Sequence, residues 1–274
     1  MSPERGFFHF CIMSALTFHK YQATGNDFIL IDNRDSRFPD DLTVIPKLCD
    51  RKFGIGSDGI ILINEHSSAD FEMVFYNPDT TQSLCGNGSR CAVRFAHELG
   101  MIGDSCAFMA FDGMHEALIN SDGTISLKMQ NVQNVRSLED GMLVDTGSPH
   151  LIRFVQGIEE VDVFGRGREI RYSAPFKSEG VNVNFVEVSG ENDIRVRTYE
   201  RGVENETLSC GTGVTAAAIA CGLRQMTGPV DITTKGGSLR VAFENDGSGT
   251  FTDVWLIGPA EHVFKGEIEL AEQD

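Results

Sequence analysis

The segment Phe71-Glu72-Met73-Val74-Phe75-Tyr76 leads through a short loop to Cys85-Gly86-Asn87-Gly88. The same plan returns in the second half of the chain, where Ile194-Arg195-Val196-Arg197-Thr198-Tyr199 leads to Cys210-Gly211-Thr212-Gly213. Apolar side chains at alternate positions predict a β-strand with one buried face. Each half therefore contains a predicted strand followed by a glycine-rich segment that begins with cysteine. We call these segments, residues 85–88 and 210–213, the two cysteine elbows.

A Thr-Gly pair opens each half at a matching distance from its elbow. Thr24-Gly25 precedes the apolar run Ile29-Leu30-Ile31, and Thr146-Gly147 precedes Leu151-Ile152. The interval from the threonine to the elbow cysteine is 61 residues in the first half (24 to 85) and 64 in the second (146 to 210). Matches in the same order and at similar spacing indicate an internal repeat. We therefore predict a duplicated α/β unit with its boundary near Met129.

Apolar residues recur at helical spacing after each elbow. They are Ala92, Phe95, Ala96 and Leu99 in the first half, and Val214, Ala217, Ala218 and Cys221 in the second. Gly100 and Gly222 are predicted to end the two helices, because glycine readily adopts the left-handed conformation found at a helix C-terminus. The second helix is apolar on nearly every side over residues 216–220, which predicts that it is buried.

Short strands outnumber helices elsewhere in the chain. Alternation or β-branched residues predict strands over residues 127–129, 239–243 and 254–257. Residues 54–59, GIGSDG, lack a following amphipathic helix and are predicted to form a turn and not a dinucleotide-binding loop. We therefore expect an α/β (α+β) fold of mostly antiparallel strands.

The composition is that of an acidic globular protein. The chain has 274 residues, 41% of them apolar, and a formal net charge of −17. This charge argues against a nucleic-acid surface and against adhesion to anionic lipid, since both need basic patches. No apolar run approaches the roughly 18 residues of a membrane-spanning helix. Residues 1–13 precede every motif and are interpreted as an N-terminal extension.

Seven cysteines in a chain of this length indicate reduced thiols and not a disulfide framework. The chain contains no CxxC pair, so no structural zinc site is expected. Cys85 and Cys210 are each placed just before a predicted helix. The unpaired N–H groups and the positive end of a helix bind anions, and the same field lowers the pKa of a nearby thiol. Because these two cysteines occupy equivalent positions in the repeat, we predict that they act as a pair.

At these residues the sequence resembles the diaminopimelate epimerase family, over nearly the whole chain from Phe18. The motifs that carry the resemblance are 25–28 (GNDF), 54–58 (GIGSD), 76–77 (YN), 85–91 (CGNGSRC), 149–150 (PH), 199–202 (YERG) and 210–213 (CGTG). The resemblance implies two pseudo-symmetric domains, residues 14–128 with 264–274 and residues 129–263. Each would have mostly antiparallel strands curled around a central helix, with the active site in the cleft between the domains.

The activity implied by the resemblance is the interconversion of LL- and meso-diaminopimelate in the biosynthesis of lysine and peptidoglycan precursors. The reaction would proceed without pyridoxal phosphate, metal or any other cofactor. The resemblance also implies a cytoplasmic enzyme that acts on a small molecule, with no nucleic-acid or membrane partner, and it admits a homodimer.

Carried over position by position, the resemblance assigns three groups of site residues. Cys85 and Cys210 are the catalytic thiols, and His150 and Glu200 modulate their pKa. The substrate-binding positions are Asn26, Asn77, Gly86, Asn87, Asn182, Glu200, Arg201, Gly211 and Thr212. One departure lies close to them, because the family often has asparagine where this chain has Ser148.

Two other interpretations stay open. A proline or hydroxyproline racemase-like enzyme also uses two thiols and shares the CGTG elbow, but motifs 25–28 and 199–202 favour diaminopimelate. A non-catalytic amino-acid-binding relative would be expected to lack one of the two cysteines, and both are present.

Deletion of residues 1–13 is expected to leave epimerase activity and the melting temperature nearly unchanged, because these residues lie upstream of every matched motif. Steady-state kinetics and thermal unfolding of the shortened chain test this expectation. A loss of activity above about tenfold, equivalent to ~1.4 kcal/mol, would show instead that the extension contributes to the site.

Overall fold

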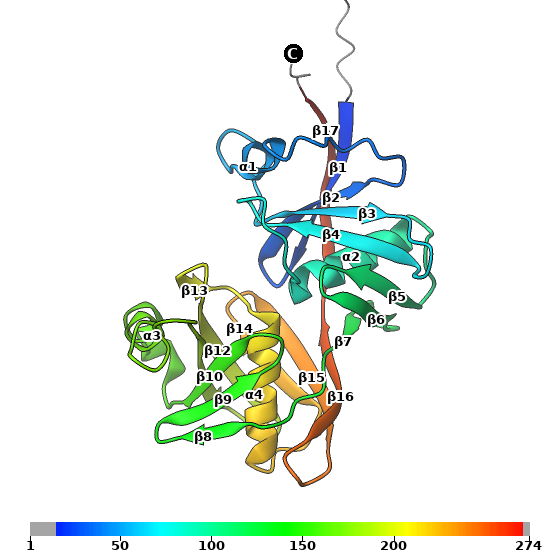
Figure 1. Ribbon diagram of the computed structural model, residues 1–274. Helices are drawn as coiled ribbons and strands as arrows, with labels where there is room; N and C mark the ends of the chain where they lie inside the picture. Colours follow the sequence, from blue (N-terminus) through cyan, green and yellow to red (C-terminus); the bar gives the residue numbers. More distant parts are fainter. Residues whose placement is uncertain (1–14, 271–274) are drawn as a thin grey trace, which may run out of the picture.

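The computed structural model describes residues 15–270 and shows a mixed α/β protein of mostly strands with few helices, as predicted (Figure 1). The predicted extension, residues 1–13, lies outside the described residues. The elements of the first half are β1 (Ala15–Ala23), β2 (Asn26–Asp32), α1 (Val44–Cys49), β3 (Ile60–Asn64), β4 (Phe71–Tyr76), α2 (Gly86–Glu98), β5 (Ser105–Ala110), β6 (Gly113–Ile119) and β7 (Ile125–Lys128). Those of the second half are β8 (Arg136–Leu138), β9 (Gly141–Asp145), β10 (Pro149–Phe154), the 3-10 helix η1 (Ile158–Glu160), α3 (Val163–Arg171), β11 (Asn182–Val188), β12 (Asp193–Glu200), β13 (Asn205–Thr207), α4 (Gly211–Leu223), β14 (Val230–Thr234), β15 (Gly237–Asn245), β16 (Phe251–Gly258) and β17 (Glu261–Glu269).

The strand pairing repeats between the two halves. In the first half, β1 is antiparallel to β2, β2 parallel to β3, β3 antiparallel to β4 and β4 parallel to β5, and antiparallel pairs then join β5 to β6 and β6 to β7. In the second half, β9, β10, β11, β12, β14, β15 and β16 pair in the same order and with the same directions. The helices recur as well. A short helix connects the first parallel pair of strands in each half, α1 between β2 and β3 and α3 between β10 and β11. The helix after the elbow is α2 in the first half and α4 in the second. The two halves are therefore pseudo-symmetric.

The halves form two lobes that are joined by sheet pairing (Figure 1). β7 of the first half is antiparallel to β16 of the second, with Leu127 opposite Leu256. The last strand, β17, runs back along β1 and pairs with it from Ala15 opposite Glu269 to Gln22 opposite Glu261. A single buried apolar cluster includes residues from both α2 and α4, for example Phe95 and Ala217. The core is therefore continuous across the junction, and this continuity holds the two elbow helices relative to each other.

The two predicted helices begin where the sequence places them. α2 starts at Gly86 and is followed by Gly100 in a left-handed conformation (φ 71°), as predicted. α4 starts at Gly211 and has buried residues on all its sides. The prediction that Gly222 ends this helix is wrong, because α4 continues to Leu223. A Cβ added at Gly222 would lie 2.7 Å from the ring of Phe251, so this glycine allows close packing and not a helix end.

Other local predictions are confirmed or extended. Residues 54–59 form a turn before β3, and Gly56 has the left-handed φ of 82° that glycine tolerates. The sequence analysis did not identify α1 and α3, which are short. The side chain of Asp162 caps α3 by accepting a hydrogen bond of 2.9 Å from the N–H of Gly165. Within residues 15–270, no helix is both long enough and apolar enough to cross a membrane.

Leu256→Ala is expected to lower the free energy of unfolding by about 2–5 kcal/mol, because this fully buried side chain fills the junction between β7 and β16. The matched control is Leu138→Ala, since Leu138 is 42% exposed and its truncation should change stability little. Denaturant unfolding of both variants checks the difference. Equal loss of stability in the two variants would contradict a core that is continuous across the junction.

Candidate active site

The two elbows place Cys85 and Cys210 at the N-caps of α2 and α4 in nearly the same backbone conformation. Their φ and ψ angles are −128° and 112° for Cys85, and −125° and 110° for Cys210. The first residues of the two helices almost touch, since a Cβ added at Gly211 would lie 3.8 Å from the Cα of Gly86. Two helix N-termini, each with unpaired N–H groups, therefore converge on one place.

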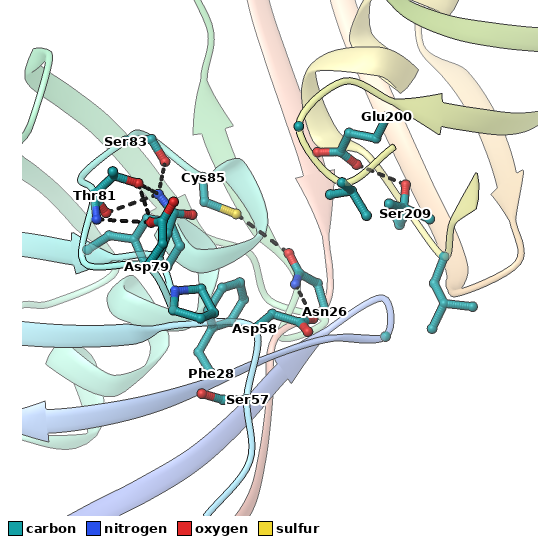
Figure 2. A pocket seen from close by; sticks show the side chains of 18 of the residues that line it. Asn26, Phe28, Ser57, Asp58, Asp79, Thr81, Ser83, Cys85, Glu200 and Ser209 are labelled. Carbon is teal, nitrogen blue, oxygen red and sulfur yellow. Dashed lines mark hydrogen bonds between the residues drawn. The ribbon is translucent and has the colours of Figure 1, made fainter. Parts of the chain in front are cut away.

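Beside this convergence lies a cleft of about 840 Å³ between the two halves (Figure 2). Its first-half wall includes Asn26, Asp58, Asn77, Thr81, Ser83 and Cys85, and its second-half wall includes Glu200, Arg201, Thr207 and Ser209. In Figure 2, Cys85 and Asn26 face the opposite segment that carries Glu200 and Ser209. The cleft therefore combines a thiol, amides and groups of both charges, which suits a zwitterionic ligand.

The thiol of Cys85 faces a hydrogen-bond acceptor. Its Sγ donates to Oδ1 of Asn26 at 3.6 Å, and Nδ2 of Asn26 in turn donates to the carboxylate of Asp58 at 2.6 Å. Arg51 bridges Asp58 and Asp27 through ion pairs of 2.7 and 2.6 Å. This network fixes the amide of Asn26 with its oxygen toward the thiol.

Asn87, the second residue of α2, connects the two halves. Its Nδ2 donates to the backbone carbonyl of Ser209 at 3.4 Å and to Oδ1 of Asn26 at 3.3 Å. Its Oδ1 accepts from the fully buried guanidinium of Arg90 at 2.8 Å. Burial lowers the pKa of Arg90 to about 10, so this group remains charged near neutral pH. Asn87 is thereby held with its amide N–H groups directed toward the second elbow.

The second elbow has its own partners. The hydroxyl of Thr212 lies 3.6 Å from Sγ of Cys210, and the hydroxyl of Thr146 donates to the carbonyl of Thr212 at 2.9 Å. Glu200 accepts a hydrogen bond of 2.9 Å from Thr207. Burial raises the pKa of Glu200, and the Thr207 hydroxyl opposes this shift.

Burial, and not the helix field, dominates the pKa of both elbow thiols. Burial raises the pKa of Cys85 to about 11, against hydrogen bonds from the N–H groups of Gly88 and Asn87. Burial also raises the pKa of Cys210, and the Glu200 carboxylate raises it further, against the Thr212 hydroxyl. The prediction that the helix N-termini give these thiols a lowered pKa is therefore wrong for the structure without ligand. The N–H groups act in the predicted direction, but the loss of solvation outweighs them.

The remaining predicted site residues lie on the wall of the cleft or directly behind it. Asn77 is held in its loop, since its Nδ2 donates to Thr81 at 3.0 and 3.1 Å and to Ser83 at 3.2 Å. Arg201 lines the cleft, and its backbone N–H donates to Oδ1 of Asn182 at 2.8 Å. Asn182 therefore positions the segment of Arg201 from behind.

His150 is fully buried on β10, behind the second elbow. Burial lowers its pKa to about 3, and the charge of Arg201 acts in the same direction, so the imidazole is neutral. Its Nε2 lies 2.9 Å from the hydroxyl of Ser148 and its Nδ1 lies 3.1 Å from Nδ2 of Asn184. The structure thus connects His150 to the elbow through other side chains.

Several residues of this site had no predicted role, among them Asp58, Ser209 and Asn184. Asp58 belongs to the 54–59 turn, and the only sequence signal for a role in the site was its position in motif 54–58. Ser209 precedes the elbow cysteine and lines the cleft. Asn184 lies two residues after Asn182 on the same strand, so polar residues at alternate positions in the buried first part of β11 were the available signal. Among the described residues, no group of three His, Cys, Asp or Glu side chains could hold a metal ion.

Comparison with solved structures shows the same fold at low sequence identity. A phenazine biosynthesis protein of the PhzF family from Bacillus anthracis superposes with a TM-score of 0.72 at 13% identity, covering 94% of this chain and 100% of that one. A hydroxyproline epimerase from Agrobacterium vitis, with bound trans-4-hydroxy-L-proline, gives a TM-score of 0.63 at 15% identity over 94% of this chain and 93% of that one. The two-lobed architecture is therefore shared well beyond close relatives.

Sequence comparison is more specific. The family model described as diaminopimelate epimerase matches residues 18–135 and 142–263. The diaminopimelate epimerase of Flavobacterium psychrophilum is 49% identical over 254 residues, which cover 91% of this chain and 99% of that one. The diaminopimelate epimerase of Aquifex aeolicus is 38% identical and covers 92% of this chain and 98% of its own length. With matches of this identity along nearly its whole length, the chain belongs to the diaminopimelate epimerase family.

Proposed function

We propose that this protein converts LL-2,6-diaminopimelate to meso-diaminopimelate by a two-base mechanism in which Cys85 and Cys210 are the reacting thiols. The observation that carries the proposal is the pair of matching N-caps, where two cysteines precede helices whose first glycines are almost in contact. An α-carbon placed between two such thiols can lose its proton to one and receive a proton from the other.

The converging helix N-termini would bind the α-carboxylate at the reacting carbon. The N–H groups at Gly86 and Asn87 belong to the first turn of α2, and those at Gly211 and Thr212 to the first turn of α4. Such groups have no partner within their helix and carry the positive end of its dipole. As the α-proton leaves, negative charge develops onto the carboxylate, and donors already in place stabilise it. In this way the chain itself can take the place of an electron-withdrawing cofactor.

The proton transfer balances across the two sulfurs. A thiolate takes the proton from the α-carbon and becomes a thiol, while the opposite thiol gives its proton to the other face and becomes a thiolate. Burial raises the pKa of both groups, so the thiolate that forms in the site is a stronger base than an exposed one. The reverse reaction exchanges the two roles.

The cleft offers matching partners for the rest of an amino-acid substrate. Glu200 can accept from an ammonium group, and Arg201 presents a planar fork for a carboxylate. Asn26 and Asn77 line the same cleft and can donate or accept. An ammonium group at Glu200 would also offset the negative charge that raises the pKa of Cys210, so substrate binding itself would favour the thiolate.

The proposal also covers the domain boundaries, the cofactor requirement, the location and the oligomeric state of the enzyme. We propose that residues 14–128 with 264–274 form one domain and residues 129–263 the other, that no cofactor is used, and that the protein acts in the cytoplasm. A homodimer is part of the same proposal. The likeness to the hydroxyproline epimerase rests on 15% identity and supports the fold alone, so it does not favour the racemase-like alternative.

Epimerisation in D₂O tests the two-base step. Starting from one pure isomer, early product is expected to carry deuterium at the α-carbon while recovered substrate carries almost none. The reason is that the delivering thiol has exchanged with solvent, whereas the abstracted proton stays on the other sulfur. Mass spectrometry of both pools at low conversion gives the answer. Substantial retention of the original proton in early product would indicate a single base that serves both faces.

Cys85→Ser and Cys210→Ser are each expected to fold normally and lose nearly all epimerisation, because a hydroxyl is far less acidic than a thiol. The matched control is Cys106→Ala, which removes a buried thiol on β5 outside the cleft and should retain activity. Turnover measured beside circular dichroism separates loss of chemistry from loss of fold. An active serine variant at either elbow would refute the assignment of that cysteine.

Glu200→Gln is expected to shift the alkylation of Cys210 to lower pH, while turnover falls. Removal of the carboxylate charge takes away one of the causes that raise the pKa of this thiol, but it also removes the partner proposed for the substrate ammonium. Alkylation rates at several pH values, read by peptide mass spectrometry, measure the shift. The exposed Glu191→Gln serves as the control. A shift to higher pH would contradict the placement of Glu200 beside Cys210.

A further inference from the structure

A series of hydrogen-bonding side chains, which we call the hydroxyl chain, runs from the buried core of the second half to the sulfur of Cys210. Nδ2 of Asn184 lies 3.1 Å from Nδ1 of His150, and Nε2 of His150 lies 2.9 Å from Oγ of Ser148. Oγ of Ser148 lies 3.5 Å from Oγ1 of Thr212, which lies 3.6 Å from Sγ of Cys210. Every member of this series can donate a hydrogen bond, the protonated thiol included, so the direction in which the protons point decides whether Thr212 donates to the sulfur or accepts from it.

The direction of these hydrogen bonds is set at the buried end of the hydroxyl chain, by the side chain of Asn184. Nδ2 of Asn184 is within 3.4 Å of the carbonyl of Leu151 and 3.5 Å of the carbonyl of Asn182, while its Oδ1 accepts from the hydroxyl of Thr198 at 2.9 Å. These partners allow only one orientation of the amide, with its N–H groups toward Nδ1 of His150. The neutral imidazole therefore accepts at Nδ1 and carries its proton on Nε2.

Ser148 receives two hydrogen bonds. One comes from Nε2–H of His150, and the other comes from Nδ2 of Asn182 at 3.2 Å. The orientation of Asn182 is also fixed, because its Oδ1 accepts from the backbone N–H of Arg201. A serine hydroxyl has two acceptor positions and one proton. With both acceptor positions used, the proton of Ser148 is left to point at Thr212.

The hydroxyl of Thr212 makes the last hydrogen bond of the hydroxyl chain. Its hydroxyl oxygen accepts from Ser148, so its own proton is free to point at Sγ of Cys210. The thiol of Cys85, in contrast, is the donor to Oδ1 of Asn26. The hydroxyl chain thus offers the second sulfur a donor, and Asn26 offers the first sulfur an acceptor. A donor favours the thiolate, and an acceptor favours the protonated thiol.

We propose that Ser148 is a positioning residue for Cys210, whose hydroxyl turns the Thr212 proton toward the sulfur and so stabilises the Cys210 thiolate. The other groups that face this sulfur are Glu200 and the Cys85 thiol, which oppose its ionisation, and the N–H of Gly213, which supports it. The importance of this residue for catalysis rests on the proposed function. Its effect on the ionisation of Cys210 does not, because that effect exists without substrate.

The test compares the pH dependence of iodoacetamide alkylation at Cys210 and at Cys85 in the substrate-free protein, read by peptide mass spectrometry. Ser148→Ala is expected to slow alkylation of Cys210 near neutral pH by about three- to tenfold, with its profile moved to higher pH, because a donor to an ionised group is lost. Alkylation of Cys85 should be unchanged. Ser148→Thr retains the hydroxyl and should restore the original profile of Cys210.

Thr212→Val removes the last link and is expected to move the Cys210 profile in the same direction. The double variant Ser148→Ala with Thr212→Val should then show no further shift, since both changes interrupt one chain. Thr212→Val also carries the test if Ser148→Ala does not fold. An unchanged Cys210 profile, an equal change at Cys85, or additive shifts in the double variant would each overturn the proposal. A shift at Cys210 in a protein without epimerase activity would uphold it while contradicting the proposed function.

Discussion

The architecture of the site depends on the meeting of two helix N-termini. The positive ends of α2 and α4 repel each other, and nothing intrinsic to either helix draws them together. They are held by packing below them, where Leu256 lies under both first glycines: added Cβ atoms at Gly86 and Gly211 would be 3.5 and 2.9 Å from its Cδ2. Asn87 adds a polar link to the carbonyl of Ser209. The absence of a side chain at Gly211 lets the two helix starts approach, because a Cβ there would displace the end of the Leu256 side chain.

In the proposed mechanism, this constraint would let a thiol pair work without an external electron sink. N–H donors at two adjacent helix starts would stabilise negative charge there better than solvent that must reorganise. The same enclosure removes water from the sulfurs and raises the pKa of both. Helix donors and burial therefore act against each other on the free thiols. In the proposed mechanism they would act together, because both would favour the transfer of a proton from a bound α-carbon.

The sequence predicted the parts that repeat. Both helix starts, the 54–59 turn and the strands before the elbows follow from apolar periodicity and glycine placement, and the structure confirms them. Periodicity could not distinguish the two roles of glycine at a helix end, so Gly222 was assigned as a stop although it packs on Phe251. The raised pKa of the two thiols could not be predicted from the sequence either. Local sequence pattern shows that each thiol precedes a helix, but it does not show how deeply the thiol is buried.

The network behind Cys210 could be seen only in part. The resemblance identified His150, and the motif comparison marked Ser148 as a departure, but the orientation of their hydrogen bonds depends on Asn184, Asn182 and two backbone carbonyls. Those partners come from neighbouring strands of the sheet, whose register no local pattern gives. Contacts of this kind are where a structure adds most to a sequence.

The most direct test of the converging helices is the response of their backbone amides to substrate. In a ¹⁵N-labelled Cys85→Ala variant, which is expected to bind substrate without turnover, titration with diaminopimelate can be followed by nuclear magnetic resonance. The account predicts that the amides of Asn87 and Thr212 shift together and saturate at the same substrate concentration, because one carboxylate contacts both helix starts. A response confined to one helix, or two different saturation points, would contradict it.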